Sequence, residues 1–514
     1  MRLTRHTAVT TRQVFWAALS SSFALLLLWS LATPLLGVPD EPSHIIRAAA
    51  VVRGDWIGSV GKDPSYATVV VPKYIANLNS EACFAFRPTT TANCPEPNIK
   101  HPDQLVAGVT TSTLNTPVYY FFTGLPSLIT NGPLTIYLMR ALSSLICALM
   151  IAFSAVALSQ LAKSTFALTA LAVSTTPVLL FLGGSVNPNG VEVCAALAVL
   201  SCLLALGRRQ AEAPLIHRQQ LVMLITSTFF LVNSRSLALA WLFFAVVIAI
   251  LFSAKGAIRR LFSKRATWIA FAVMSIVVIA AVAWYLLPKG IVQNAAVAVG
   301  EDVAPSDAFW FMVVHVFDYA AGWVGIFGWL DIAAPPITFA IWGALTAVAI
   351  AAALVSGTWA KRIALLILIA AIVLLPAIAQ AALISNWGYV WQGRYHLAIF
   401  AMLLVAAGVA IDSGQKDFSH QLWTPWLIAG VIGATAIGHI AAFVVVLRRY
   451  AVGTNFPPIF MLTDPRWQPP LGLVGLVIVF AVTLAVVGWL TWRAITSRVL
   501  FDTSTGSRSP INRP

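Results

Sequence analysis

Residues 37–47 read Gly37-Val38-Pro39-Asp40-Glu41-Pro42-Ser43-His44-Ile45-Ile46-Arg47, and they begin where the first long apolar run of the chain ends. Two prolines flank the adjacent carboxylates of Asp40 and Glu41 and hold them on a stiff backbone. The second proline suits the first turn of a new helix, which would place both acids at its positive end. His44 and Arg47 would follow one and two turns further along. Simple capping of a helix by acids and proline is the alternative for this stretch.

The composition is that of a membrane protein. Of 514 residues, 59% are hydrophobic, only 10% are charged and 18 are Trp, which excludes an ordinary soluble domain. Apolar runs of roughly 17–25 residues predict about twelve transmembrane helices in an all-α fold. The predicted spans are 14–36, 134–158, 166–183, 189–206, 219–233, 236–253, 268–287, 337–356, 362–384, 396–411, 424–446 and 471–492. Residues 309–330 fit either a further span or an interfacial helix, so the number is eleven to thirteen.

The distribution of Lys and Arg predicts the orientation. If the N-terminus is cytoplasmic, that side collects 19 of the 32 basic residues and 4 of the 18 acidic ones, a net charge of +15, and the other side carries −1. The positive-inside rule then predicts a protein of the cytoplasmic (inner) membrane with both termini in the cytoplasm and residues 37–133 on the outer side. The high positive charge indicates topology and contact with anionic lipid. It does not indicate nucleic acid, because no basic loop is interleaved with aromatic residues.

These boundaries divide the chain into six segments. They are a first transmembrane helix at 1–36, an external loop domain at 37–133, helices two to seven at 134–288, a second external segment at 289–336, helices eight to twelve at 337–492, and a disordered cytoplasmic tail at 493–514. The first segment resembles a signal peptide but lacks a small-x-small cleavage site, so we expect it to stay attached. Cys83 and Cys94 lie on the oxidising side and predict a disulfide, which we favour over a metal pair.

Further polar and aromatic candidates lie at the predicted outer ends of the spans. Residues 113–122 are too short to cross the bilayer and predict an interfacial or re-entrant helix, or an aromatic anchor, with Tyr119 and Tyr120 at headgroup depth. Turn chemistry alone can explain Asn187-Pro188-Asn189, so that motif by itself is a weak signal. Snorkelling is the usual role of an arginine placed like Arg235, and a binding role is the less common alternative. His315 and Asp318 fit a metal pair or, more commonly, solvated polarity.

Eight polar candidates from distant parts of the sequence fall on the same predicted side of the membrane. They are Asp40, Glu41, His44, Asn187, Arg235, Asp331, Gln392 and Arg394. One outward-facing site is the economical interpretation. In such a site arginine would hold a leaving phosphate while a carboxylate accepts the proton of a hydroxyl nucleophile, and the apolar, aromatic surroundings would suit a lipid tail.

Five short motifs in this order resemble a family of multi-span bacterial membrane proteins, common in actinobacteria, that is grouped with the GT-C glycosyltransferases. The motifs are Pro39-Asp40-Glu41-Pro42-Ser43-His44, Asn115-Thr116-Pro117-Val118-Tyr119-Tyr120, Ser185-Val186-Asn187-Pro188-Asn189, Gly328-Trp329-Leu330-Asp331 and Gln392-Gly393-Arg394-Tyr395. The resemblance implies a GT-C-like helical fold with a large first external loop, a polyprenyl-phosphate sugar as donor, and an envelope glycan or lipid as acceptor. One departure is Asn189, where the family pattern has Asp.

Carried over by position, the resemblance implies roles for individual residues. Asp40 is the expected general base, with Glu41 as its partner or a metal ligand, and Arg394 and Arg235 are the expected phosphate holders. The other expected substrate-binding residues are His44, Arg47, Tyr119, Tyr120, Asn187, Asn189, Asp331, Gln392 and Tyr395. The residues leave the need for a divalent cation open. Two alternatives are a transporter or flippase of lipid-linked sugars, and a non-catalytic partner in envelope assembly.

Overall fold

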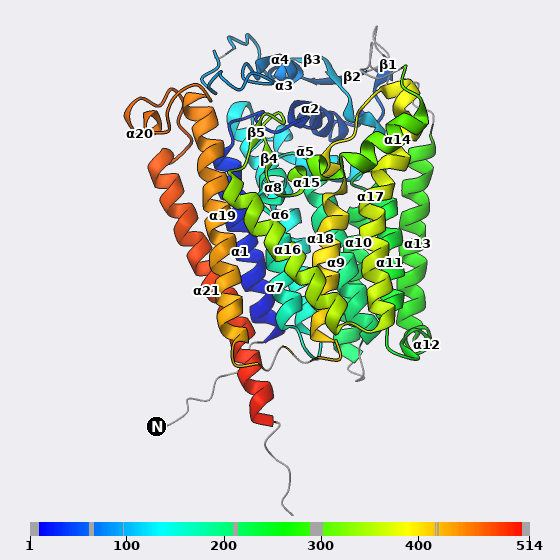
Figure 1. Ribbon diagram of the computed structural model, residues 1–514. Helices are drawn as coiled ribbons and strands as arrows, with labels where there is room; N and C mark the ends of the chain where they lie inside the picture. The colour runs from blue at the N-terminus through cyan, green and yellow to red at the C-terminus, as the bar shows by residue number, and fades with distance from the viewer. Residues whose placement is uncertain are drawn as a thin grey trace, which may run out of the picture.

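A computed structural model describes residues 10–60, 66–95, 97–208, 214–287, 302–416, 418 and 421–505. Most of these residues are helical, and Figure 1 shows the long helices side by side, with short helices and strands across one end. Within the described ranges, nine helices are long and apolar enough to cross a membrane, and a bent pair raises the number to ten. The prediction of a multi-span helical membrane protein is therefore confirmed, whereas the number of about twelve spans stays a prediction.

The long helices begin and end close to the predicted spans. They are α1 (Thr11–Ala32), α6 (Gly132–Ser159), α9 (Pro188–Arg208), α13 (Arg265–Leu286), α16 (Pro336–Ser356), α17 (Trp359–Trp387), η3 (Gly393–His396) joined to α18 (Leu397–Asp412), α19 (Thr424–Val452) and α21 (Leu473–Thr505). Two further apolar helices, α10 (Pro214–Val232) and α11 (Ala238–Phe252), pack against α9. The last helix continues past residue 492, where the sequence predicts the span to end, and residues 506–514 of the predicted tail lie outside the described part.

One predicted span is broken in two. The range 166–183 forms α7 (Thr165–Ser174) and α8 (Pro177–Gly183), which are bent by 64° at the break. Pro177 explains the bend, because it has no backbone N–H and restricts the residue before it to extended conformations. Thr176 is extended and caps the new helix by accepting a hydrogen bond from the Leu179 N–H.

The segment between α1 and α6 forms a layer over one end of the bundle (Figure 1). Its elements are α2 (Glu41–Val51), β1 (Ser59–Val60), β2 (Ala67–Pro72), α3 (Lys73–Ala76), α4 (Leu78–Glu81), β3 (Leu105–Thr110), η1 (Ser112–Leu114), α5 (Pro117–Gly124) and η2 (Leu125–Leu128). The strands form an antiparallel sheet in the order β1-β2-β3, with Ala67 opposite Thr110 and Pro72 opposite Leu105. The sequence interpretation missed this sheet because β2 is a short apolar run without polar alternation. All of α2 is buried, packed against β2, β3 and α5.

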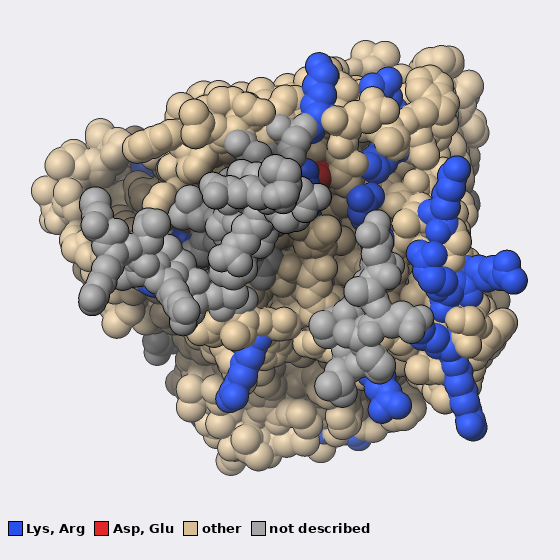
Figure 2. All heavy atoms as spheres, turned by 90° about the horizontal axis from the view of Figure 1, so that it is seen from below, with Lys and Arg blue, Asp and Glu red and all other residues tan. Residues whose placement is uncertain are grey.

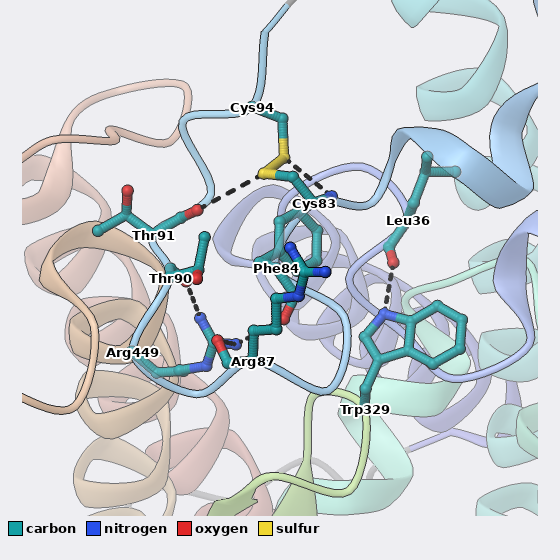
Figure 3. The surroundings of a disulfide bond; sticks show 9 residues. All are labelled: Leu36, Cys83, Phe84, Arg87, Thr90, Thr91, Cys94, Trp329 and Arg449. Carbon is teal, nitrogen blue, oxygen red and sulfur yellow. Dashed lines mark hydrogen bonds between the residues drawn. A yellow bond between two sulfur atoms is a disulfide. The ribbon is translucent and has the colours of Figure 1, made fainter.

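The predicted disulfide is confirmed, since Cys83 and Cys94 are bonded. The loop that this bond closes is held from below by Arg449 of α19 (Figure 3). The guanidinium of Arg449 donates hydrogen bonds to three carbonyls of that loop, those of Phe84, Arg87 and Thr90, at 2.6–3.0 Å. This contact fastens the layer to the end of a long helix.

The second predicted external segment is only partly described, since residues 288–301 lie outside the described ranges. Its remainder forms α14 (Pro305–Val314), α15 (Val316–Val324) and a two-stranded ribbon of β4 (Ile326–Phe327) and β5 (Ile332–Ala333). The two helices are ten and nine residues long and are interrupted at His315, so neither is long enough to cross a bilayer. Residues 309–330 therefore do not form a further span.

The end of the bundle opposite the layer is strongly basic. Figure 2 shows Lys and Arg side chains projecting over this end, with little Asp or Glu surface visible. The short α12 (Ala257–Phe262), which carries two arginines, lies here, as do the start of α1 and the end of α21 (Figure 1). Lys and Arg side chains of the described residues thus gather at this end, and the cytoplasmic orientation of that end stays a prediction. The short α20 (Phe460–Thr463) lies near the other end (Figure 1).

Candidate active site

Asp40 and Arg394, 354 residues apart in the sequence, are in direct contact. Asp40 is the residue before the first turn of α2, and its backbone is left-handed, with φ 65°. Its side chain makes no capping hydrogen bond to α2, so capping does not account for this carboxylate. Instead Oδ2 accepts a hydrogen bond from Nη2 of Arg394 at 2.5 Å. The Asp40 side chain is 47% exposed and that of Arg394 only 5% exposed.

A second set of contacts joins the Asn187-Pro188-Asn189 turn to the residue before Asp40. Nδ2 of Asn187 donates a hydrogen bond to the Pro39 carbonyl at 3.1 Å. Oδ1 of Asn187 accepts one from Nδ2 of Asn189 at 2.8 Å, and Oδ1 of Asn189 accepts one from Nη1 of Arg235. The turn is therefore more than a connector, since it fixes the position of Arg235 relative to Asp40.

The ring of Tyr395 completes this arrangement. The guanidinium carbon of Arg235 lies 4.6 Å from the centroid of that ring, and the one of Arg394 lies 5.4 Å from it. Both distances are within the range of cation–π attraction. A chain of contacts thus runs from Asp40 through Arg394, Tyr395, Arg235 and the asparagine turn to the carbonyl of Pro39, the residue that precedes Asp40. Hereafter we call this set the charged ring.

A partly open cavity of about 200 Å³ lies beside the charged ring. Its lining includes Arg394 and Gln392 on one side and apolar residues of α8, among them Phe181, on another. Nε and Nη1 of Arg394 and Oε1 of Gln392 are buried and have no hydrogen-bond partner among the residues described. Buried donors and acceptors are normally satisfied, so these unused groups mark a place for a polar ligand.

The glycine of the Gln392-Gly393-Arg394-Tyr395 motif allows η3 to pack closely on α15. A Cβ atom on Gly393 would lie 2.1 Å from the Tyr319 carbonyl oxygen and 2.9 Å from the Cα of Gly322. Only a residue without a side chain fits there. The close approach fixes the position of the neighbouring Arg394 relative to α15.

Substitution of Gly393 by alanine is expected to destabilise the protein by about 1–3 kcal/mol, because the added methyl group overlaps the backbone of α15. The measurement is the thermal unfolding midpoint of the purified protein in detergent. Gly343→Ala in α16 is the matched control, since a Cβ there meets no atom within 4 Å and alanine favours the helix. Equal midpoints for Gly393→Ala and Gly343→Ala would contradict the close packing.

His44 lies one turn into α2, behind Asp40. Its Nδ1 is 2.9 Å from both the Tyr120 hydroxyl and the Ser112 Oγ, and Asn115 donates to the same tyrosine hydroxyl at 3.0 Å. Burial lowers the pKa of His44 to about 3, despite the opposing charge of Asp40. His44 is therefore neutral at physiological pH and does not act as a cation for phosphate.

Asp40 is charged at neutral pH. Burial raises the pKa of this carboxyl group, but the charge and hydrogen bond of Arg394, with smaller contributions from other neighbours such as Arg235, lower it by more, so that the pKa lies below its ordinary value of 3.8. The preceding residue, Pro39, and the partner of the carboxylate, Arg394, both line the cavity. A charged, half-exposed carboxylate in this position can accept a proton or a hydrogen bond from a bound hydroxyl group.

Glu41 points away from the cavity and pairs with Arg140 of α6. The two carboxylate oxygens accept hydrogen bonds from Nε and Nη2 of Arg140 at 2.7 and 2.6 Å, and neither side chain is exposed. Arg140 also donates to three carbonyls at the end of α1, those of Ser30, Thr33 and Pro34. This pair locks the corner between α1 and α2. Arg140 lies inside the predicted span 134–158, and an arginine in a span indicates a buried acidic partner. The sequence interpretation did not use this signal.

Besides Glu41, His44, Tyr120 and Gln392, three more of the predicted site residues lie outside the charged ring. Asp331 pairs with Arg449 at 2.8 Å, below the disulfide loop. The Tyr119 hydroxyl is 2.9 Å from the Ser143 Oγ, in the buried contact between α5 and α6. Arg47 packs over the Tyr120 ring, with its guanidinium carbon 5.8 Å from the centroid.

Gln380 of α17 is a positioning residue that the sequence did not reveal. Its Oε1 accepts hydrogen bonds from the backbone N–H groups of Val390 and Trp391 at 3.1 Å, and its Nε2 donates to the Gly388 carbonyl at 2.6 Å. These bonds hold the loop before η3, and Trp391 of this loop lines the cavity. Among the described parts of the chain, no group of three or more His, Cys, Asp or Glu side chains is arranged to hold a metal ion.

The fold and the charged ring define a multi-span helical membrane protein with a charged cavity at the end that the layer of short helices and strands covers. The chain belongs to the family described as "Predicted membrane protein (DUF2142)", which matches residues 23–404. The chain is similar to a crystal structure of ArnT from Cupriavidus metallidurans bound to undecaprenyl phosphate. The match covers 97% of this chain and 80% of the ArnT chain, with a TM-score of 0.40 and 15% sequence identity. A likeness of this size leaves the chemistry to be argued from the site. None of the curated proteins matches the sequence.

Proposed function

We propose that this protein is a membrane glycosyltransferase that moves a sugar from a polyprenyl-phosphate donor to an envelope glycan or lipid on the outer face of the cytoplasmic membrane. The observation that carries the proposal is Arg394. Its side chain is buried and lines the cavity. Two of its guanidinium nitrogens have no hydrogen-bond partner among the described residues, and the third donates a hydrogen bond to the Asp40 carboxylate.

The chemistry of these two groups suits glycosyl transfer. A guanidinium is always charged and presents several donors, which matches the oxygens of a phosphate, and burial strengthens the attraction. In the proposed reaction the acceptor hydroxyl attacks the anomeric carbon of the donor sugar while the bond from that carbon to the phosphate oxygen breaks. The hydroxyl proton passes to Asp40, and the charge of the leaving polyprenyl phosphate stays beside Arg394 and Arg235.

The surroundings favour a transferase over a transporter. Val178, Phe181 and Leu182 of α8 form an apolar wall of the cavity, which suits the first isoprene units of a lipid. The buried ionic pair of Glu41 and Arg140 fixes the corner where α1 ends, close to Asp40. A pathway for transport would instead require such groups at the middle of the bilayer.

The test is a transfer assay with the purified protein in liposomes, radiolabelled polyprenyl-phosphate sugars and envelope glycan as acceptor. Arg394→Ala is expected to lower the transfer rate by about a hundredfold or more, because the leaving phosphate loses its main cation. Arg87→Ala is the control, since that side chain is exposed at the same end of the molecule. Transfer at the wild-type rate by Arg394→Ala, or no transfer by the wild type from any donor, would refute the proposal.

The pH dependence of transfer follows from the two pKa shifts. Between about pH 5 and about pH 8 His44 is neutral and Asp40 is ionised, so neither group changes its protonation state in this range. The transfer rate should therefore be constant there and fall only in stronger acid, where Asp40 becomes protonated and can no longer act as a base. The pH–rate profiles of wild type and His44→Gln should therefore have the same shape. An inflection near pH 6.5 that disappears in His44→Gln would show that the histidine titrates in the functional range.

A further inference from the structure

Asp318 lies on the face of α15 that packs against η3. It is four residues before Gly322, and residues four apart share a face of a helix. Gly322 is the residue of α15 that contacts the backbone of Gly393. Asp318 is accordingly one of the residues that line the cavity, together with Gln392 and Arg394.

The Asp318 carboxylate is available to a ligand. It is exposed at the cavity and makes no hydrogen bond or ion pair with the residues described. By contrast Asp307, on the neighbouring α14, is exposed but does not line the cavity. The cavity therefore combines unused donors on Arg394 with two acceptors, the carboxylate of Asp318 and the buried, unpartnered Oε1 of Gln392.

We infer that Asp318 and Gln392 bind hydroxyl groups of the donor sugar while Arg394 holds its phosphate, so that the cavity selects a neutral or amino sugar and disfavours a uronic acid. This inference rests on the proposed function. An ionised carboxylate only accepts hydrogen bonds, so it attracts hydroxyl and ammonium groups and repels a second carboxylate. At about 200 Å³ the cavity is smaller than the sites of drug-sized ligands, which suits a single sugar rather than an oligosaccharide.

The test is a binding assay with the full-length protein in nanodiscs. The probes are polyprenyl phosphate itself and polyprenyl phosphates that carry glucose, galactose, mannose, arabinose or glucuronic acid. We expect at least one neutral sugar to bind more tightly than the bare lipid, and Asp318→Asn to weaken that binding about tenfold or more without changing the affinity for the bare lipid. The glucuronic acid lipid should bind about tenfold more weakly than the glucose lipid, and Asp318→Asn should narrow this gap. Asp307→Asn, the matched control, should behave as wild type.

Three results would overturn the inference while leaving the proposed function standing. They are unchanged binding of the preferred sugar lipid by Asp318→Asn, an equal loss of affinity for the bare lipid, and a wild-type preference for glucuronic acid. Binding of all five sugar lipids no more tightly than the bare lipid would also overturn it, since the sugar would then make no contact. If the wild type binds neither the bare lipid nor any sugar lipid, the proposed function fails and the inference fails with it.

Discussion

Replacement of Asp40 by asparagine is expected to slow sugar transfer by about a hundredfold or more while the protein stays folded. Asparagine has nearly the same shape, tolerates the left-handed backbone of this position, and can still accept a hydrogen bond from Arg394. It cannot take up the proton of the acceptor hydroxyl. The measurement is the single-turnover rate in liposomes, together with the thermal unfolding midpoint of each protein.

The control for this prediction is Asp464→Asn, which removes an exposed carboxylate after α20 and should transfer sugar at the wild-type rate. Binding of polyprenyl phosphate should also survive in Asp40→Asn, because the donors of Arg394 remain. A non-catalytic role in envelope assembly makes the opposite prediction, since a structural partner would function normally with asparagine at this position.

Replacement of Arg140 by methionine is expected to destabilise the protein by about 3–5 kcal/mol, the largest loss that we expect for any single change. Glu41 would remain as a fully buried charge without its partner, and three carbonyls at the end of α1 would lose their donor. The measurement is the free energy of unfolding in denaturant, or the thermal midpoint where unfolding is irreversible.

The double variant Arg140→Met with Glu41→Gln distinguishes a lost ion pair from a simple loss of packing. Removal of the second charge should recover part of the stability, because the unpaired charge causes much of the damage. If the double variant is as unstable as the sum of the two single changes, the pair is not coupled. If the refolded double variant transfers sugar, Glu41 acts by positioning the Asp40 corner and not as a catalytic residue.

Much of the site was predictable because its residues share one property, a position at the same end of the predicted spans. Asp40, Asn187, Arg235 and Arg394 are separated by long apolar helices, and the topology alone brings them to one side of the membrane. Helix packing decides which of these residues contact each other, but the order of the spans already decides on which side of the membrane they lie. Apolar length and the placement of Lys and Arg are strong signals, which is why the membrane architecture was also predictable.

The pairing of buried charges was not predictable from the sequence. Glu41 reads as a partner of its neighbour Asp40, but the structure pairs it with Arg140, 99 residues away. Asp331 reads as a site residue, but it pairs with Arg449 below the disulfide loop. Nothing in sequence spacing distinguishes such partners, because the choice is made when distant helices pack. The sequence interpretation assigned Asp318 to solvated polarity, because the cavity beside this exposed acid forms only when distant elements pack together.

The most direct measurement is an experimental structure of the wild-type protein in nanodiscs with a polyprenyl phosphate bound. The phosphate is expected at hydrogen-bond distance, about 2.7–3.1 Å, from Nε or Nη1 of Arg394, beside the Asp40 carboxylate, with the lipid chain leaving along α8. A phosphate bound at another place, with Arg394 still without a ligand, would contradict the proposal that these two residues form a glycosyl-transfer site.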